Sequence, residues 1–163
     1  MYTDMTEELS RSAKRVQDAL ALLGTVFEVV QLPSSTRTAV EAANAIGCSV
    51  EQIAKSILFR TVKDKKPVLV IASGVNRVNE ARVADIVGEP IEKADAAYVR
   101  EKTGFVIGGV PPIGHLESIH TIIDEDLLRL GELWAAAGTP NSVFKLSATS
   151  LLEITAGTLN SIK

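Results

Sequence analysis

The segment VLVIA at residues 68–72 constrains the fold of this chain more than any other part of the sequence. Five consecutive apolar residues are typical of a strand whose two faces are both covered by other elements. Residues 56–62 also have the composition of a strand, and only the short polar turn at 64–67 separates the two segments. Two strands joined in this way predict a hairpin inside a sheet that carries layers on both faces.

Signals for helix ends divide the rest of the chain. Thr38 with Glu41 fits a capping box and Gly47 ends that helix, while Ser49 with Gln52 fits a second box that opens a short helix. The other expected helices are 7–23, 79–87, 94–102 and 148–155, and Asp124 is expected to cap one helical turn. The other expected strands are 26–31, 105–107, 118–123, 143–146 and 158–162, whereas 132–136 fits either a strand or a helix. This irregular alternation predicts a mixed α/β fold, with a mixed sheet curled into a barrel-like core and helices outside it.

Composition limits the class of protein. The 163 residues fit a single domain spanning 1–163, and the 4% aromatic content requires an aliphatic core. A net charge of −3 argues against a protein that binds nucleic acid mainly by bulk charge. One cysteine and two histidines make a disulfide or a structural metal site unexpected, and we expect no cofactor. The first fifteen residues do not have the pattern of a secretory leader and no apolar run is long enough to cross a membrane, so we expect a cytoplasmic protein.

The common nucleophile motifs are missing from the sequence. There is no G-x-S-x-G, H-E-x-x-H or Walker A pattern. Cys48 lies between two capped helices and is expected to be a small packed residue rather than a nucleophile. His120 is expected to face solvent from a strand. His115 directly follows a loop of glycines and prolines, and it is either a ligand-binding residue or a solvated loop residue.

That loop, at residues 108–114, is the first candidate site. Gly108 and Gly109 permit backbone geometries closed to other residues, and Pro111 and Pro112 fix the loop that follows. The amides of Gly108, Gly109 and Val110 are then expected to converge on one acceptor, as in an oxyanion or phosphate site. A tight structural turn is the alternative interpretation.

Lys55 is the second candidate. Its apolar neighbours place its stem along apolar surface, where the ammonium either extends to water or presents a fixed charge to a phosphate or an oxyanion. Four basic residues follow it around the expected hairpin, and they form either a local patch that attracts a polyanion or an ordinary solvated tip. These four residues are Arg60, Lys63, Lys65 and Lys66.

At these residues the sequence resembles the YbaK/EbsC family of free-standing aminoacyl-tRNA deacylases, which are related to the insertion domain of bacterial prolyl-tRNA synthetase. The resemblance runs from about Pro33 to the C-terminus. Its carriers are TRTAVEAANAIGCSVEQIAKSILF at 36–59, TGFVIGGVPPIGH at 103–115, IID at 122–124 and WAAAGTPNSVFKL at 134–146. Lys55 falls on the functional lysine of the family, and Gly108 and Pro112 fall on its G-x-x-x-P loop. The sequence departs at Val143, near which the cysteine-editing branch carries an acidic residue, and this argues against Cys-tRNA(Pro) as the substrate.

The resemblance implies hydrolysis of the ester that joins a wrong amino acid to the 3′-terminal adenosine of a tRNA. Lys55, Gly108 and Gly109 would be catalytic, with water as the attacking group and the ribose hydroxyl of the substrate taking up the proton. A small amino acid such as Ala, Ser, Thr or Cys is implied, with tRNA(Pro) as one candidate carrier. The expected substrate-binding residues are Thr36, Val110, Pro111, Pro112, His115, Ala137 and Gly138.

The expected partner is the acceptor end of tRNA, with an aminoacyl-tRNA synthetase or an elongation factor as a further candidate. The main competing function is a regulatory module that binds a nucleotide or an aminoacyl ligand without hydrolysing it, since Lys55 and the glycine loop would serve there equally well. A sequence-specific DNA-binding protein fits less well, because the sequence contains no basic recognition helix.

Overall fold

The computed structural model describes residues 10–24, 27–33 and 38–163. These residues form one mixed eight-stranded sheet in which the strand order is β1-β7-β6-β2-β3-β5-β8, with β4 beside β2. The strands are β1 (Val29–Gln31), β2 (Ile53–Thr61), β3 (Pro67–Ser73), β4 (Ile91–Lys93), β5 (His120–Asp124), β6 (Leu133–Ala136), β7 (Ser142–Leu146) and β8 (Thr158–Asn160). The mixed α/β class expected from the sequence is confirmed, and β1 and β8 form the two ends of the strand path.

The hairpin predicted from the apolar segment is the centre of this sheet. β2 and β3 are antiparallel from the Ala54–Ser73 pair to the Arg60–Pro67 pair, and β5 lies parallel to β3 on its other side. Side chains of a strand alternate between its two faces, so β3 supplies two cores. Leu69 and Ile71 belong to the larger core, whereas Val68 and Val70 belong to a second core on the opposite face.

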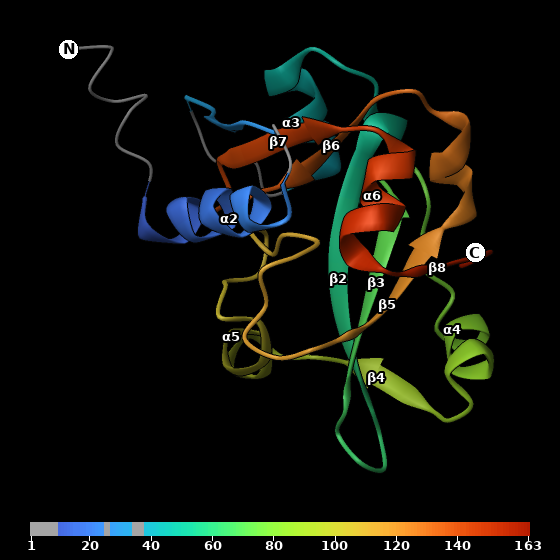
Figure 1. The fold of residues 1–163 in the computed structure, drawn as a ribbon. Helices are drawn as coiled ribbons and strands as arrows, with labels where there is room; N and C mark the ends of the chain where they lie inside the picture. Colours follow the sequence, from blue (N-terminus) through green and yellow to red (C-terminus); the bar gives the residue numbers. More distant parts are fainter. Residues whose placement is uncertain (1–9, 25–26, 34–37) are drawn as a thin grey trace.

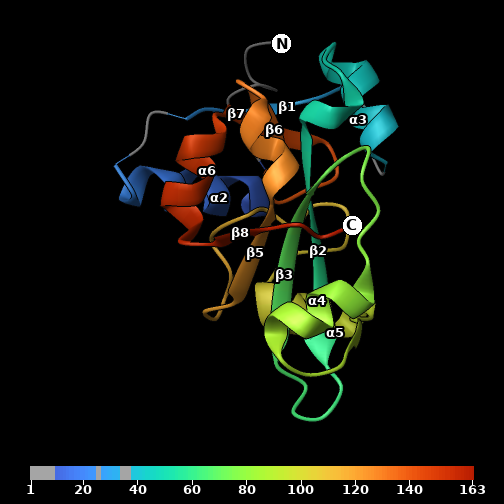
Figure 2. The same ribbon diagram turned by 90° about the vertical axis from the view of Figure 1, so that its right-hand side faces the viewer.

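Helices cover both faces (Figures 1 and 2). α2 and α6 pack on the larger core through Val16 and Leu151, and α4 covers the second core through Val83. α3 packs on a third, smaller core around Ile53. The helices are α2 (Arg11–Leu22), α3 (Ala39–Ile46), α4 (Glu80–Val87), α5 (Ala96–Thr103) and α6 (Ala148–Thr155), with short 3₁₀ helices at Val50–Gln52 and Glu125–Arg129. No helix among the described residues is long and apolar enough to span a bilayer.

The capping signals located α3 accurately. Thr38 accepts from the Glu41 amide and the Glu41 carboxylate accepts from the Thr38 amide, which completes the predicted capping box, and Gly47 ends α3 in the left-handed region. The segment at 132–136 is a strand, because it pairs with both β2 and β7. The predicted strand at 105–107 is wrong: Phe105 is buried in the larger core, but the segment pairs with no strand and leads into a turn.

Candidate functional site

β2 has a gap along one edge. β6 pairs with β2 only as far as Ala54, and β4 begins to pair at Phe59. The carbonyl of Leu58 accepts from the Ala94 amide on this edge. The N–H and C=O groups of successive residues in a strand point to alternate edges, so those of Ser56 point to the same edge as those of Leu58. Among the described residues, no strand pairs with Ser56 at this edge.

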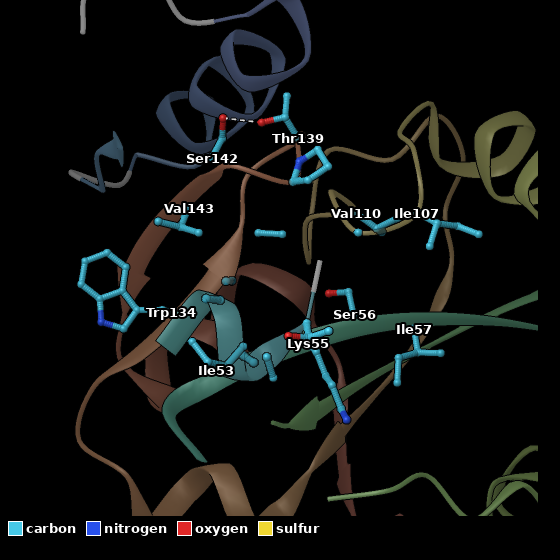
Figure 3. Close-up of a pocket in the computed structure, with 18 residues that line it drawn as sticks. Ile53, Lys55, Ser56, Ile57, Ile107, Val110, Trp134, Thr139, Ser142 and Val143 are labelled. Carbon is cyan, nitrogen blue, oxygen red and sulfur yellow. Dashed lines mark hydrogen bonds between the residues drawn. The ribbon is translucent and has the colours of Figure 1, made fainter. Parts of the chain in front are cut away.

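A cavity of about 230 Å³ lies at this gap (Figure 3). One wall is α3, the floor is formed by β2 and β6, and the opposite wall is formed by residues 107–110 and 139–143. Most of its lining is aliphatic or aromatic, and the described residues that line it include no carboxylate. The lining residues are Thr38, Ala39, Ala42, Ile53, Ala54, Lys55, Ser56, Ile57, Ile107, Gly108, Val110, Trp134, Ala135, Ala136, Thr139, Pro140, Ser142 and Val143.

The two glycines shape one wall for different reasons. Gly108 has a φ of 92°, which a residue with a Cβ rarely adopts. Gly109 is required by close packing, because a Cβ there would lie 2.7 Å from the Cα of Thr139. The Gly109 carbonyl also accepts from the Gly138 amide at 2.9 Å, so the two loops of this wall are joined directly.

One part of the prediction for this loop is wrong. The Gly109 amide does not point into the cavity, because it donates to the Val106 carbonyl at 3.0 Å and closes the turn. Among the described residues, the amides of Gly108 and Val110 have no acceptor. Both of these residues line the cavity, so two amides of this loop rather than three are left without an acceptor there.

Lys55 lies on β2 and lines the same cavity as Gly108. Its side chain is half-buried and extends away from the labelled Val110 and Thr139, so its ammonium lies at the rim of the cavity (Figure 3). Burial lowers the pKa of Lys55 below its ordinary value, and the charge of Arg77 lowers this pKa further, whereas Asp124 acts in the opposite direction. The structure thus brings Lys55 and the glycine loop to one cavity without placing the ammonium against the loop.

Ser56 is a candidate residue that the sequence did not indicate. Its Oγ is almost inaccessible to solvent and has no hydrogen-bond partner among the described residues. The other hydroxyls nearby differ, because Thr139 Oγ1 lies 2.6 Å from Ser142 Oγ. In Figure 3 the Ser56 hydroxyl points to the side of the strand that faces Val110. A buried hydroxyl without a partner is costly, which makes Ser56 a candidate contact for a polar ligand atom.

Several predicted substrate-binding residues lie elsewhere. The His115 ring Nε2 lies 2.7 Å from the Pro111 carbonyl, and burial lowers the pKa of His115. Pro112 and His115 line a separate groove beside α2 rather than the cavity of Lys55. Pro111 is buried and is not among the residues that line the cavity.

Ala137 and Gly138, which were also predicted to bind substrate, are not among the described residues that line the cavity. Ala137 is fully buried in the larger core, and a Cβ at Gly138 would lie 2.6 Å from the carbonyl oxygen of Ser12 in α2. Their neighbours Ala136 and Thr139 line the cavity instead. Thr36 lies outside the described residues.

The other residues that the sequence singled out, Cys48, His120 and the four basic residues around the hairpin, do not line the cavity. Cys48 is half-buried against the core around α3, and burial raises the pKa of its thiol. His120 is exposed, as expected. Glu92 binds both Arg60 and Lys65, so the basic patch predicted at the hairpin is partly neutralised. The described residues contain no group of three or more His, Cys, Asp or Glu side chains able to hold a metal ion.

The family of the chain follows from comparison with known proteins. Residues 33–154 match the profile of the aminoacyl-tRNA editing domain, so the chain belongs to this family. The matched range includes β2 with Lys55, the loop with Gly108, and β6 and β7. The relationship that the sequence motifs indicated is therefore confirmed.

Individual relatives show how this domain occurs elsewhere. The uncharacterized protein YwhH of Bacillus subtilis (strain 168) is 31% identical over 126 residues, which cover 77% of this chain and 80% of that protein. Proline--tRNA ligase of Desulforamulus reducens is 32% identical over 95 residues, but these are 58% of this chain and only 16% of the ligase. A solved structure, described as that of a proposed trans-editing enzyme for prolyl tRNA synthetase, has 45% identity and a TM-score of 0.91 and covers 96% of this chain and 99% of its own.

Proposed function

We propose that this protein hydrolyses the ester bond between a small, wrongly attached amino acid and the 3′-terminal adenosine of a tRNA, acting in trans. The observation that carries this proposal is the cavity between the gap in β2 and the loop at 107–110, which Lys55 and Gly108 both line. Membership of the editing-domain family supports the same reaction.

The cavity supports a small aminoacyl group. Its volume of about 230 Å³ is below the range of about 300–1,000 Å³ that is usual for ligand pockets, so a large side chain would be excluded. Val143 and Val110 present apolar surface to the bound side chain, while the Ser56 hydroxyl offers one hydrogen bond. Exclusion by size separates a small amino acid from a larger correct one more strongly than the loss of one methylene from a pocket would.

The chemistry requires positioning more than a strong nucleophile, because an aminoacyl ester is already reactive. In the proposed step, the oxygen of a water molecule bonds to the ester carbon while the carbonyl oxygen takes up negative charge. In this proposal the amides of Gly108 and Val110, which have no acceptor among the described residues, donate to that oxygen. The bond from carbon to the ribose oxygen then breaks, and the ribose oxygen receives the proton that the water gives up.

Lys55 has a supporting electrostatic role in this proposal. Its four-carbon stem begins in the cavity lining, and a rotation of that stem carries the ammonium from the rim toward the ester or the neighbouring phosphate. A fixed positive charge there stabilises the transition state more than the ground state, since the negative charge develops only as water attacks. The tRNA acceptor end is the proposed partner. Because the net charge of −3 predicts weak affinity for the rest of the tRNA, we propose a synthetase or an elongation factor as the source of further affinity.

The test is release of amino acid from a panel of tRNAs, each charged with Ala, Ser, Thr, Cys or Pro. We expect release of one or more small amino acids, and a reduction of about a hundredfold or more in the Lys55→Ala variant. Lys63→Ala is the matched control, because Lys63 is an exposed lysine of the turn that follows β2. Full activity of Lys55→Ala on a confirmed substrate would remove Lys55 from the mechanism.

A binding module without hydrolysis is the second candidate function. The direction of the Lys55 side chain favours it, because the ammonium does not lie against the glycine loop. The same panel separates the two functions: a mischarged tRNA that binds tightly and keeps its amino acid through the incubation supports the module.

A further inference from the structure

A second cavity, of about 400 Å³, adjoins the first at Lys55 and Ile57, which line both. It is formed between one face of the sheet and the segment that connects β3 to α4. Its other lining residues are Phe59, Gly74, Val75, Asn76, Arg77, Val78, Glu80 and Lys93.

The register of the sheet aligns the basic groups of this cavity. Lys55, Ile57 and Phe59 alternate along β2, so their side chains share one face. Lys93 of β4 pairs with Phe59 and therefore lies on that same face. Arg77 reaches the cavity from the segment after β3. Three cations from three separate parts of the chain thus line one continuous path that begins at the first cavity.

These cations differ from the other basic residues nearby. Among the described residues, Lys55, Arg77 and Lys93 form no ion pair, whereas Arg60 and Lys65 are both bound to Glu92. One acidic residue lines the path and a second lies near Lys55. Glu80 lines the cavity, and Asp124 accepts from the Ser73 amide and from Asn76 Nδ2. The charge of Arg77 lowers the pKa of Lys55, which is consistent with the closeness of the two cations.

The size of the first cavity gives the second one a role for the proposed substrate. A volume of about 230 Å³ fits an aminoacyl group and leaves no room for the nucleotides that precede the terminal adenosine. Those nucleotides carry one phosphate each and must leave the first cavity across its rim. Lys55 marks the rim where the second cavity begins.

We propose that the second cavity is a phosphodiester-binding subsite, in which Arg77 and Lys93 hold the backbone of the tRNA 3′ end while Lys55 stands between it and the ester. This inference rests on the proposed deacylase function. The subsite recognises phosphate charge and carries no base specificity, as is usual for Lys and Arg contacts to a nucleic-acid backbone.

The test compares two substrates that carry the same amino acid. One is the full mischarged tRNA, and the other is the aminoacyl ester of adenosine, which lacks phosphates. Kinetics are measured for the unchanged protein, for Arg77→Gln and Lys93→Gln, and for the double variant. Lys63→Gln and Lys66→Gln are the controls, because both lysines are exposed in the turn at the far end of β2, about 20 Å along the strand from Lys55.

We expect Arg77→Gln and Lys93→Gln each to raise KM for the tRNA about threefold to tenfold more than KM for the adenosine ester. Each should also reduce the slope of log(kcat/KM) against log(salt) by about 0.7 for the tRNA alone. The change in kcat/KM of Arg77→Gln for the adenosine ester measures any indirect influence of Arg77 on Lys55. The proposed subsite would be overturned if Arg77→Gln and Lys93→Gln changed KM equally for both substrates. It would also be overturned if the control variants raised KM for the tRNA as much as these two variants do. If the unchanged protein releases no amino acid from either substrate, the proposed function itself fails.

Discussion

Replacing Ser56 with alanine tests whether the cavity is built for a ligand. The Ser56 Oγ is almost inaccessible to solvent and has no partner among the described residues, so the free protein bears the desolvation cost of this hydroxyl. Such a group costs about 1–3 kcal/mol. Removing it is expected to stabilise the protein by about 1 kcal/mol, which corresponds to a rise in Tm of about 2–4 °C for a chain of this size.

The same replacement should impair the reaction. If the hydroxyl binds a polar atom of the substrate, its loss removes one neutral hydrogen bond, worth about 0.5–1.5 kcal/mol. This corresponds to a decrease in kcat/KM of about 2-fold to 13-fold. A residue retained only for packing would not combine a gain of stability with a loss of activity.

Ser73→Ala is the matched control, because Ser73 lies on the neighbouring strand and its hydroxyl donates to the Glu51 carbonyl at 2.8 Å. Its loss should lower Tm by about 2–4 °C, opposite in sign to the effect of Ser56→Ala. Both variants are measured by thermal unfolding and by the deacylation assay. A fall in Tm for Ser56→Ala together with unchanged kcat/KM would refute the reasoning, since it would mean that the hydroxyl is satisfied within the protein.

Two further predictions concern the opposite wall and the rim of the cavity. Gly109→Ala should destabilise the protein by about 1–3 kcal/mol and reduce deacylation, because the backbone of the adjacent loop cannot move away from the new Cβ. Gly131→Ala is the control, because a Cβ there meets no atom within 4 Å, and it should change neither stability nor activity. Equal melting curves for the two variants would contradict this prediction. Deacylation, corrected for spontaneous hydrolysis, should fall as the pH rises through the lowered pKa of Lys55, because the proposed mechanism requires its charged form. A Lys55→Arg variant should keep a flat profile, and the same fall in that variant would assign the titration to another group.

The sequence predicted well those elements whose signals are local. The capping box at Thr38, the glycine that ends α3 and the apolar segment of β3 each specify a conformation through neighbours within a few residues. The hairpin followed from them, because its connection is short. These features account for the two central strands of the sheet.

Elements that depend on distant contacts were missed. β4 is a strand only because it meets β2, and nothing in its three residues predicts that partner. The segment at 105–107 has the composition of a strand, yet its apolar Phe105 is satisfied by burial in the core and the segment finds no strand to pair with.

The candidate site also contains both residues that a local motif indicates and residues that only distant contacts reveal. Lys55 and Gly108 were found because each belongs to a recognisable motif. Ser56 was not found, because its distinctive property is a missing hydrogen-bond partner, which depends on residues far along the chain. Ala137 and Gly138 do not line the cavity, whereas Ala136 and Thr139 do, and only the tertiary structure decides between these neighbours.

The interruption in the pairing of β2 has a consequence for solubility. Exposed strand edges invite a strand from another molecule, which is a common route to aggregation. Here the open stretch is only a few residues long, and β6 and β4 bound it on either side. A foreign strand therefore finds no continuous register to extend, while a small molecule can still reach the peptide groups of Ser56.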